Sequence, residues 1–217
     1  MKKLLSELAD WIYRKRCYIC SKSYENRKLC SKCYEKIEFL PACVSRIVSS
    51  TNVYCACEYK AEIQKIIRGL KYHKKRELAY FQAKVMYDYW QRLNKSDDFL
   101  VIPIPLSKER EKERSYNHMV LVAQEFCALT GYELNTTLVS RIKNTKPQYK
   151  LTRKERMENL DRAFEINIDS YNNKPVLILD DICTTGATFE SVIEQLKKHN
   201  ITKITCFATS TPLGGAK

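Results

Sequence analysis

The chain has 217 residues, of which 44% are hydrophobic and 11% aromatic, so it can bury a real core and is not a disordered chain. The formal net charge of +13 favours polyanionic partners: nucleic acid, phosphorylated substrates or an anionic membrane surface. No apolar run reaches the roughly 18 residues that a membrane-spanning helix needs.

The first twelve residues carry large apolar side chains at helical spacing. These side chains are Leu4, Leu5, Leu8, Trp11 and Ile12. Because Ser6, Glu7 and Asp10 interrupt the apolar run of a secretory signal, the pattern predicts an amphipathic helix. We expect this helix to pack onto the body of the protein, with binding to a membrane surface as the alternative.

Four of the ten cysteines form two C-x-x-C pairs. Cys17 and Cys20 are followed after nine residues by Cys30 and Cys33, a spacing at which four thiolates can surround one tetrahedral zinc ion. Without a secretion signal the thiols should stay reduced, which favours metal over disulfides. Redox-active pairs are the alternative. Four thiolates leave no open position, so the zinc is expected to be structural.

The middle of the chain alternates strand and helix patterns. We predict a strand over 52–59, helices over 61–70 and 77–93, a buried strand over 99–105, a charged loop over 107–117 and a helix over 118–129. This order is typical of a doubly wound sheet. Arg110 and Arg114 in the charged loop either bind a phosphate or belong to an ordinary solvated turn.

Basic residues gather around the zinc cysteines and in the segments 60–76 and 141–156. Each of these two segments has a single acidic residue. Tyrosines lie among the basic residues near the cysteines, and such mixtures can bind and stack single-stranded nucleic acid. Solvated charges and packing tyrosines are the alternative. The candidate nucleic-acid contacts are Lys28, Lys32, Lys71, Lys74, Lys75, Arg153 and Arg156.

The most informative segment is the strand, turn and helix pattern over 176–199. Four apolar residues precede Asp180 and Asp181, and a small-residue turn leads into a helical pattern. Helix-start N–H groups would face an anion there, and the two carboxylates suit ribose hydroxyls or Mg²⁺ shared with a diphosphate. The alternative is an ordinary strand-to-helix loop. The candidate phosphate ligands are Thr184, Thr185, Gly186, Ala187 and Thr188.

Two competing nucleotide-binding patterns are missing from the sequence. It contains neither G-x-x-x-x-G-K-[ST] nor G-x-G-x-x-G, so an ATPase P-loop and a dinucleotide fingerprint do not compete for the phosphate turn.

The run Asp-Asp-x-x-Thr-Thr-Gly-x-Thr resembles the PRPP-binding motif of the type I phosphoribosyltransferases. That resemblance implies that Asp180 and Asp181 contact the ribose 2′ and 3′ hydroxyls and that residues 184–188 hold the 5-phosphate. Further motifs narrow the resemblance to the ComF (ComFC) competence family. They are the zinc cysteines, Leu70-Lys71-Tyr72, Ile102-Pro-Ile-Pro-Leu106, Arg114-x-x-Asn117, Gln148-x-x-Leu151, Arg156-x-x-Asn159 and Phe164.

The ComF resemblance implies an α/β fold: a type I phosphoribosyltransferase-like parallel sheet of about five strands with helices on both faces, after a small zinc module. We expect the N-terminal helix and zinc module in 1–45 and the phosphoribosyltransferase-like domain in 46–217. Arg110 and Arg114 would line the diphosphate side of a site for PRPP with Mg²⁺, and 141–164 would form a hood.

The same resemblance implies a function in DNA uptake during natural transformation. The protein would handle single-stranded DNA in the cytoplasm, alongside proteins of the uptake machinery and with peripheral association at the inner membrane. Two departures matter. Ser115 stands where the family has glycine, and Thr184 stands where purine enzymes have an aspartate base. Turnover is therefore left open, and a phosphoribosyltransferase of nucleotide or small-molecule metabolism without a DNA role is the alternative.

Overall fold

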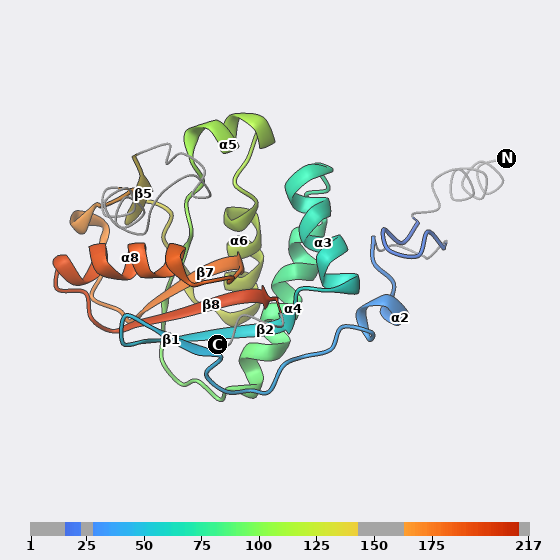
Figure 1. Cartoon of the computed structure of the whole chain (residues 1–217), viewed down its shortest axis with the longest axis horizontal. Coiled ribbons are helices and arrows are strands. Elements are labelled where there is room, and N and C mark those ends of the chain that lie inside the picture. Colours follow the sequence, from blue (N-terminus) through green and yellow to red (C-terminus); the bar gives the residue numbers. More distant parts are fainter. Residues whose placement is uncertain (1–15, 23–27, 143–162, 213–217) are drawn as a thin grey trace, which may run out of the picture.

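A computed structural model describes residues 16–22, 28–142 and 163–212 (Figure 1). The expected N-terminal helix, most of the expected hood, and Arg153 and Arg156 lie outside the described residues. Within these ranges, no helix is both long enough and apolar enough to cross a bilayer.

The main sheet has six strands in the order β1-β2-β8-β7-β3-β4. Five of them run parallel, as the sequence predicts, and β1 adds an antiparallel edge. A separate two-stranded sheet pairs β5 with β6. The strands are β1 (Arg46–Val48), β2 (Thr51–Glu58), β3 (Leu100–Pro103), β4 (Glu133–Leu134), β5 (Val139–Arg141), β6 (Phe164–Ile166), β7 (Val176–Ile182) and β8 (Ile204–Thr211).

Helices cover both faces of the main sheet (Figure 1). Their bounds are α2 (Ser31–Tyr34), α3 (Ala61–Tyr72), α4 (Leu78–Arg92), α5 (Lys108–Arg114), α6 (His118–Thr130) and α8 (Ala187–Lys198), with a short 3₁₀ turn η2 (Ile168–Ser170). The helices predicted over 61–70, 77–93 and 118–129, the helical pattern up to residue 199, and the predicted strands are thereby confirmed. The predicted charged loop over 107–117 is wrong in part, because α5 forms inside it.

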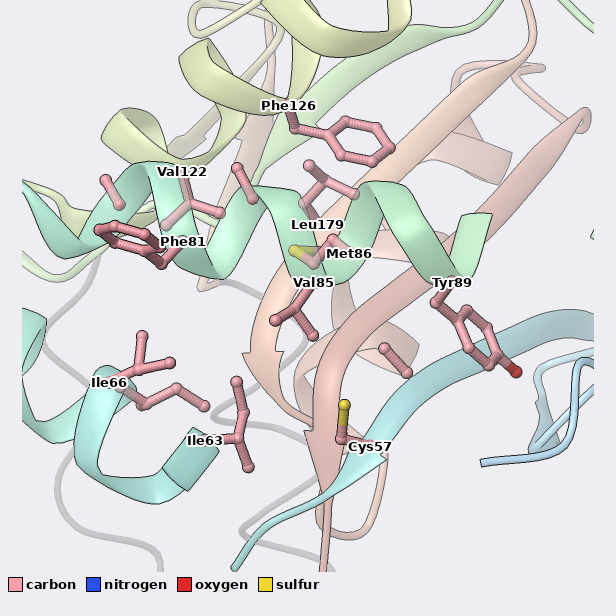
Figure 2. Packing of buried hydrophobic residues seen from close by; sticks show 14 of the residues in the cluster. Cys57, Ile63, Ile66, Phe81, Val85, Met86, Tyr89, Val122, Phe126 and Leu179 are labelled. Atoms are coloured by element: carbon pink, nitrogen blue, oxygen red, sulfur yellow. The ribbon is translucent and has the colours of Figure 1, made fainter. Parts of the chain in front are cut away.

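Side-chain alternation along β7 explains why both faces need a cover. Leu177 and Leu179 point into one core. Figure 2 shows part of this core, with Leu179 near Phe126 and Met86. Val176 and Ile178 point to the opposite face, against the apolar side of α8. Because neighbouring strand residues alternate in direction, a continuously apolar strand belongs in the middle of such a sheet.

Candidate functional site

A cleft of about 270 Å³ opens where β3 and β7 end, next to each other in the sheet. Ligands of open α/β sheets bind at this carboxyl edge. Basic and acidic side chains from five elements or their adjoining loops line the cleft. The polar residues among them are Lys71, Arg110, Arg114, His118, Arg141, Asp180, Asp181, Thr184 and Thr188.

The turn after β7 is built mainly from backbone. Gly186 has a φ of +90°, and a Cβ at this position would lie 2.8 Å from Cγ2 of Val48, so the turn needs glycine for both its conformation and its close approach to β1. Arg46 of β1 donates a hydrogen bond to the carbonyl of Thr184. The first N–H groups of α8, which begins at Ala187, have no intrahelical acceptor and suit a phosphate.

The segment after β3 presents side chains instead. Ser107 caps α5 by accepting a hydrogen bond from the N–H of Arg110, and acidic residues in the first turn with basic ones in the last match the helix dipole. These local signals explain why a helix forms where the sequence predicted a loop. The helix carries Arg110 and Arg114 to the cleft.

Ser115 ends α5 in the left-handed conformation, with a φ of +65°. The ComF resemblance places glycine here, and the sequence raised the question whether serine could serve. The serine adopts the conformation that glycine would adopt, at a cost of roughly 1 kcal/mol. The α5 segment therefore keeps its turn.

The two adjacent carboxylates have different surroundings because consecutive strand residues point to opposite faces. Asp181 is 4% exposed and faces the α3 and α6 side, where Nζ of Lys71 lies 2.6 Å and Nε2 of His118 lies 2.5 Å from its Oδ2 atom. Asp180 is half-buried and accepts a hydrogen bond from the backbone N–H of Asp181. The other ring nitrogen of His118, Nδ1, lies 3.3 Å from Nη1 of Arg114.

These surroundings shift the carboxylates in opposite directions. Burial opposes the charge of Asp181, but the hydrogen bond from His118 and the charge of Lys71 outweigh it and hold the pKa of Asp181 below its usual range. For Asp180, burial and then the neighbouring charge of Asp181 raise its pKa. Burial lowers the pKa of His118 despite the hydrogen bond to Asp181 and the charge of that carboxylate.

Sequence reasoning missed three residues of this cleft. Lys71 was assigned to a nucleic-acid surface, yet its side chain lies in the cleft against Asp181. No role was predicted for His118, and Arg141 was predicted only as part of the basic segment 141–156. Two signals in the sequence could have pointed to them. Lys71 lies inside a motif of the ComF resemblance, and His118 directly follows Asn117 of another.

The four cysteines of the N-terminal pairs come together as predicted. Their sulfur atoms lie within 4.8 Å of one another, and those of Cys20 and Cys30 are 3.9 Å apart. Thiolates around a tetrahedral zinc ion lie about 3.8 Å apart, so the set fits this metal. Cys17, Cys30 and Cys33 are buried in the same core as α3 and α4.

The four-cysteine module also contacts the main body through polar side chains. The hydroxyl of Tyr34 donates to a carboxylate oxygen of Asp88 on α4 at 2.8 Å, and Lys28 pairs with Glu77 at 3.2 Å. Of the candidate nucleic-acid residues, Lys32, Lys74 and Lys75 are exposed on this side of the molecule.

Comparison with known proteins gives a family match over roughly the second half of the chain. Residues 114–214 match the family model "Phosphoribosyl transferase domain". The glutamine phosphoribosylpyrophosphate amidotransferase structure from B. subtilis aligns with a TM-score of 0.45 and 10% identity, over 65% of this chain and 30% of that one. The family match and the strand order support the fold of the type I phosphoribosyltransferases.

Two curated relatives narrow this class. The chain is 30% identical to Competence protein F from Haemophilus influenzae over 48% of this chain and 46% of that protein. It is 36% identical to Competence protein ComFC from Bacillus subtilis over 42% of this chain and 35% of that protein. The chain thus spans about half or less of these relatives. These matches support the resemblance to the ComF family of competence proteins.

Proposed function

We propose that the protein binds PRPP with Mg²⁺ in the cleft and serves DNA uptake in natural transformation by handling single-stranded DNA in the cytoplasm. The observation that supports PRPP is that two candidate anion-binding segments line one cleft together with a carboxylate. Thr184 and Thr188 of the turn after β7, Asp180, and the arginines of α5 all line it. PRPP carries matching groups, a phosphate and a diphosphate at opposite ends of a ribose.

Each group of the ligand has a proposed partner. The N–H groups of 184–188 would hold the 5-phosphate, Asp180 would accept hydrogen bonds from the ribose hydroxyls, and Arg110 and Arg114 would face the diphosphate. Asp180 also fits Mg²⁺ shared with the diphosphate, because its carboxylate is half-buried at the cleft. The metal would neutralise charge on the leaving diphosphate.

The chemistry that such a site supports is displacement at C1 of the ribose, with diphosphate departing. Thr184 cannot take a proton at neutral pH, so the turn supplies no base for an acceptor. Any turnover would rest on orientation of the ligand and on neutralisation of the diphosphate by the arginines.

Calorimetric titration of PRPP with Mg²⁺ into the zinc-loaded protein tests the proposal. We expect binding that falls at least about tenfold in Asp180→Ala, because a hydrogen-bonded charged group is lost. Asp169→Ala, an exposed acid on η2, serves as the matched control and should bind like the native protein. Native protein that is folded yet does not bind PRPP would refute the proposal.

A basic and aromatic ridge beside the cleft supports the single-stranded DNA role. We use "ridge" for Arg68, Tyr72, Arg76 and Tyr116 with Lys74 and Lys75. Tyr72 is 62% exposed, with the guanidinium of Arg68 at 5.8 Å from its ring centre and that of Arg114 at 5.5 Å. Arg76 lies 4.6 Å from the ring centre of Tyr116. Guanidinium and tyrosine surfaces of this kind suit a phosphate backbone and unpaired bases.

Fluorescence anisotropy with a labelled oligonucleotide tests the ridge. Because phosphate contacts release counterions, affinity should fall steeply with salt, and Arg76→Ala should both weaken binding and reduce the salt slope by about one. Lys203→Ala is the control, since this exposed lysine lies just before β8, at the opposite end of the sheet. Salt-insensitive or absent binding would leave a phosphoribosyltransferase without a DNA role.

A further inference from the structure

The two ring nitrogens of His118 contact groups that belong to different ends of the cleft. Nε2 lies 2.5 Å from Oδ2 of Asp181 on β7, and Nδ1 lies 3.3 Å from Nη1 of Arg114 on α5. His118 is only 2% exposed, so water does not compete for these two contacts. His118 therefore joins the carboxylate end of β7 to the arginine segment after β3.

The partners of His118 fix its tautomer. A guanidinium has donors only, so Nδ1 must accept from Arg114, and the ring proton must then sit on Nε2 and be donated to Asp181. Asp181 meets a second cation on the same oxygen, Nζ of Lys71 at 2.6 Å. The result is a chain of contacts from Arg114 through His118 and Asp181 to Lys71.

The backbone of His118 is also held in place. Asn117, the residue before it, accepts a hydrogen bond from the N–H of Met119 at 2.9 Å and so caps α6. The amide of Asn117 donates to the carbonyl of Ile104 at 3.2 Å, just beyond the end of β3. His118, the first residue of α6, is thereby anchored to the strand edge that carries the cleft.

We propose that His118 is a positioning residue of the cleft: it orients Asp181 and Arg114 together, so that the ribose end and the diphosphate end of the site form one unit. The inference rests on the proposed PRPP site. It assigns Asp180, which points away from this chain of contacts, as the carboxylate that meets the ligand, whereas Asp181 acts mainly from within the protein.

A matched set of substitutions tests this role. Glutamine offers an amide donor and a carbonyl acceptor, as the neutral imidazole does, whereas leucine fills the space with neither. We expect His118→Leu to weaken binding of PRPP with Mg²⁺ by about tenfold or more, and His118→Gln to restore most of it. His199→Leu, at the exposed end of α8, is the control and should bind normally.

A ligand-free measurement separates this inference from the PRPP proposal. In ¹⁵N spectra of the imidazole rings, His118 should be neutral with its proton on Nε2, and its Nδ1 resonance should shift in Arg114→Leu. A proton on Nδ1 would overturn the inference. So would a folded His118→Leu protein that binds PRPP like the native one, or a His118→Gln protein as weak as the leucine variant. Native protein that shows the expected tautomer but binds no PRPP refutes the proposed ligand and leaves the positioning contacts standing.

Discussion

The two segments that follow β7 and β3 begin at the same edge of the sheet but are built in different ways. The turn at 184–188 uses backbone groups and a glycine that packs against Val48. The segment at 107–117 uses a short helix, a left-handed serine and arginine side chains. A backbone site depends on one conformation and tolerates little change, whereas a side-chain site can lose one contact at a time. Substitutions should therefore act on the two segments unequally.

The largest effect is expected for Gly186→Ala. The added Cβ would meet Val48 at 2.8 Å at a φ that alanine rarely adopts, so the free energy of unfolding should fall by about 1–3 kcal/mol and PRPP binding should be lost. Gly131→Ala is the control, because Gly131 has a similar φ of +81° but no atom within 4 Å of the added Cβ. Equal losses in urea unfolding of both variants would show that the contact with Val48 does not matter.

A smaller and more selective effect is expected in the α5 segment. Arg110→Ala should weaken PRPP by about tenfold because one charged contact to the diphosphate is lost, while affinity for ribose 5-phosphate stays within about twofold. Lys112→Ala, on the same helix but outside the cleft lining, is the control. Calorimetry with both ligands measures the difference. An equal loss for both ligands would contradict the assignment of Arg110 to the diphosphate end.

Between the two segments, Asp180 should make PRPP binding depend on pH. Its pKa is raised by burial and by the charge of Asp181, and the charged form is the one that would accept ribose hydroxyls. Affinity should therefore rise with pH until it passes the raised pKa, by at most about tenfold per pH unit. Stability of the empty protein should fall over the same window, because the unfolded chain releases this proton at lower pH.

Calorimetry over a pH series checks this dependence. Asp180→Asn measured over the same series corrects for ionisation of the ligand itself. If the native protein and the variant change in parallel, the dependence does not come from Asp180.

The smallest effect is a stabilisation. Ser115→Gly should raise the free energy of unfolding by about 1 kcal/mol, because glycine adopts the φ of +65° without strain. Asn200→Gly is the control, since Asn200 has a φ of +61° and asparagine tolerates that conformation better. Urea unfolding measures both. A destabilised Ser115→Gly protein would show that the serine contributes something other than its backbone shape.

The sequence predicted the backbone site far better than the side-chain site. A continuous apolar strand, two acids, a glycine turn and a helical pattern are local signals, so the turn after β7 could be located from adjacent residues alone. The contacts of Asp181 come from Lys71 and His118, which are distant in the chain and meet only once α3, α6 and β7 have packed. Strand alternation could have predicted that Asp180 and Asp181 face different surroundings, but not which residues would meet them.

The central position of β8 has a consequence for how the protein forms. This last strand pairs with β2 on one side and with β7 on the other, so the sheet is divided until β8 enters it. We therefore expect the pairing that joins the β2 side of the sheet to the β7 side to form only after residues 204–211 have been synthesised. Pairing between parts so distant along the chain is slow. The edge of the sheet that carries the cleft is therefore expected to be completed late in folding.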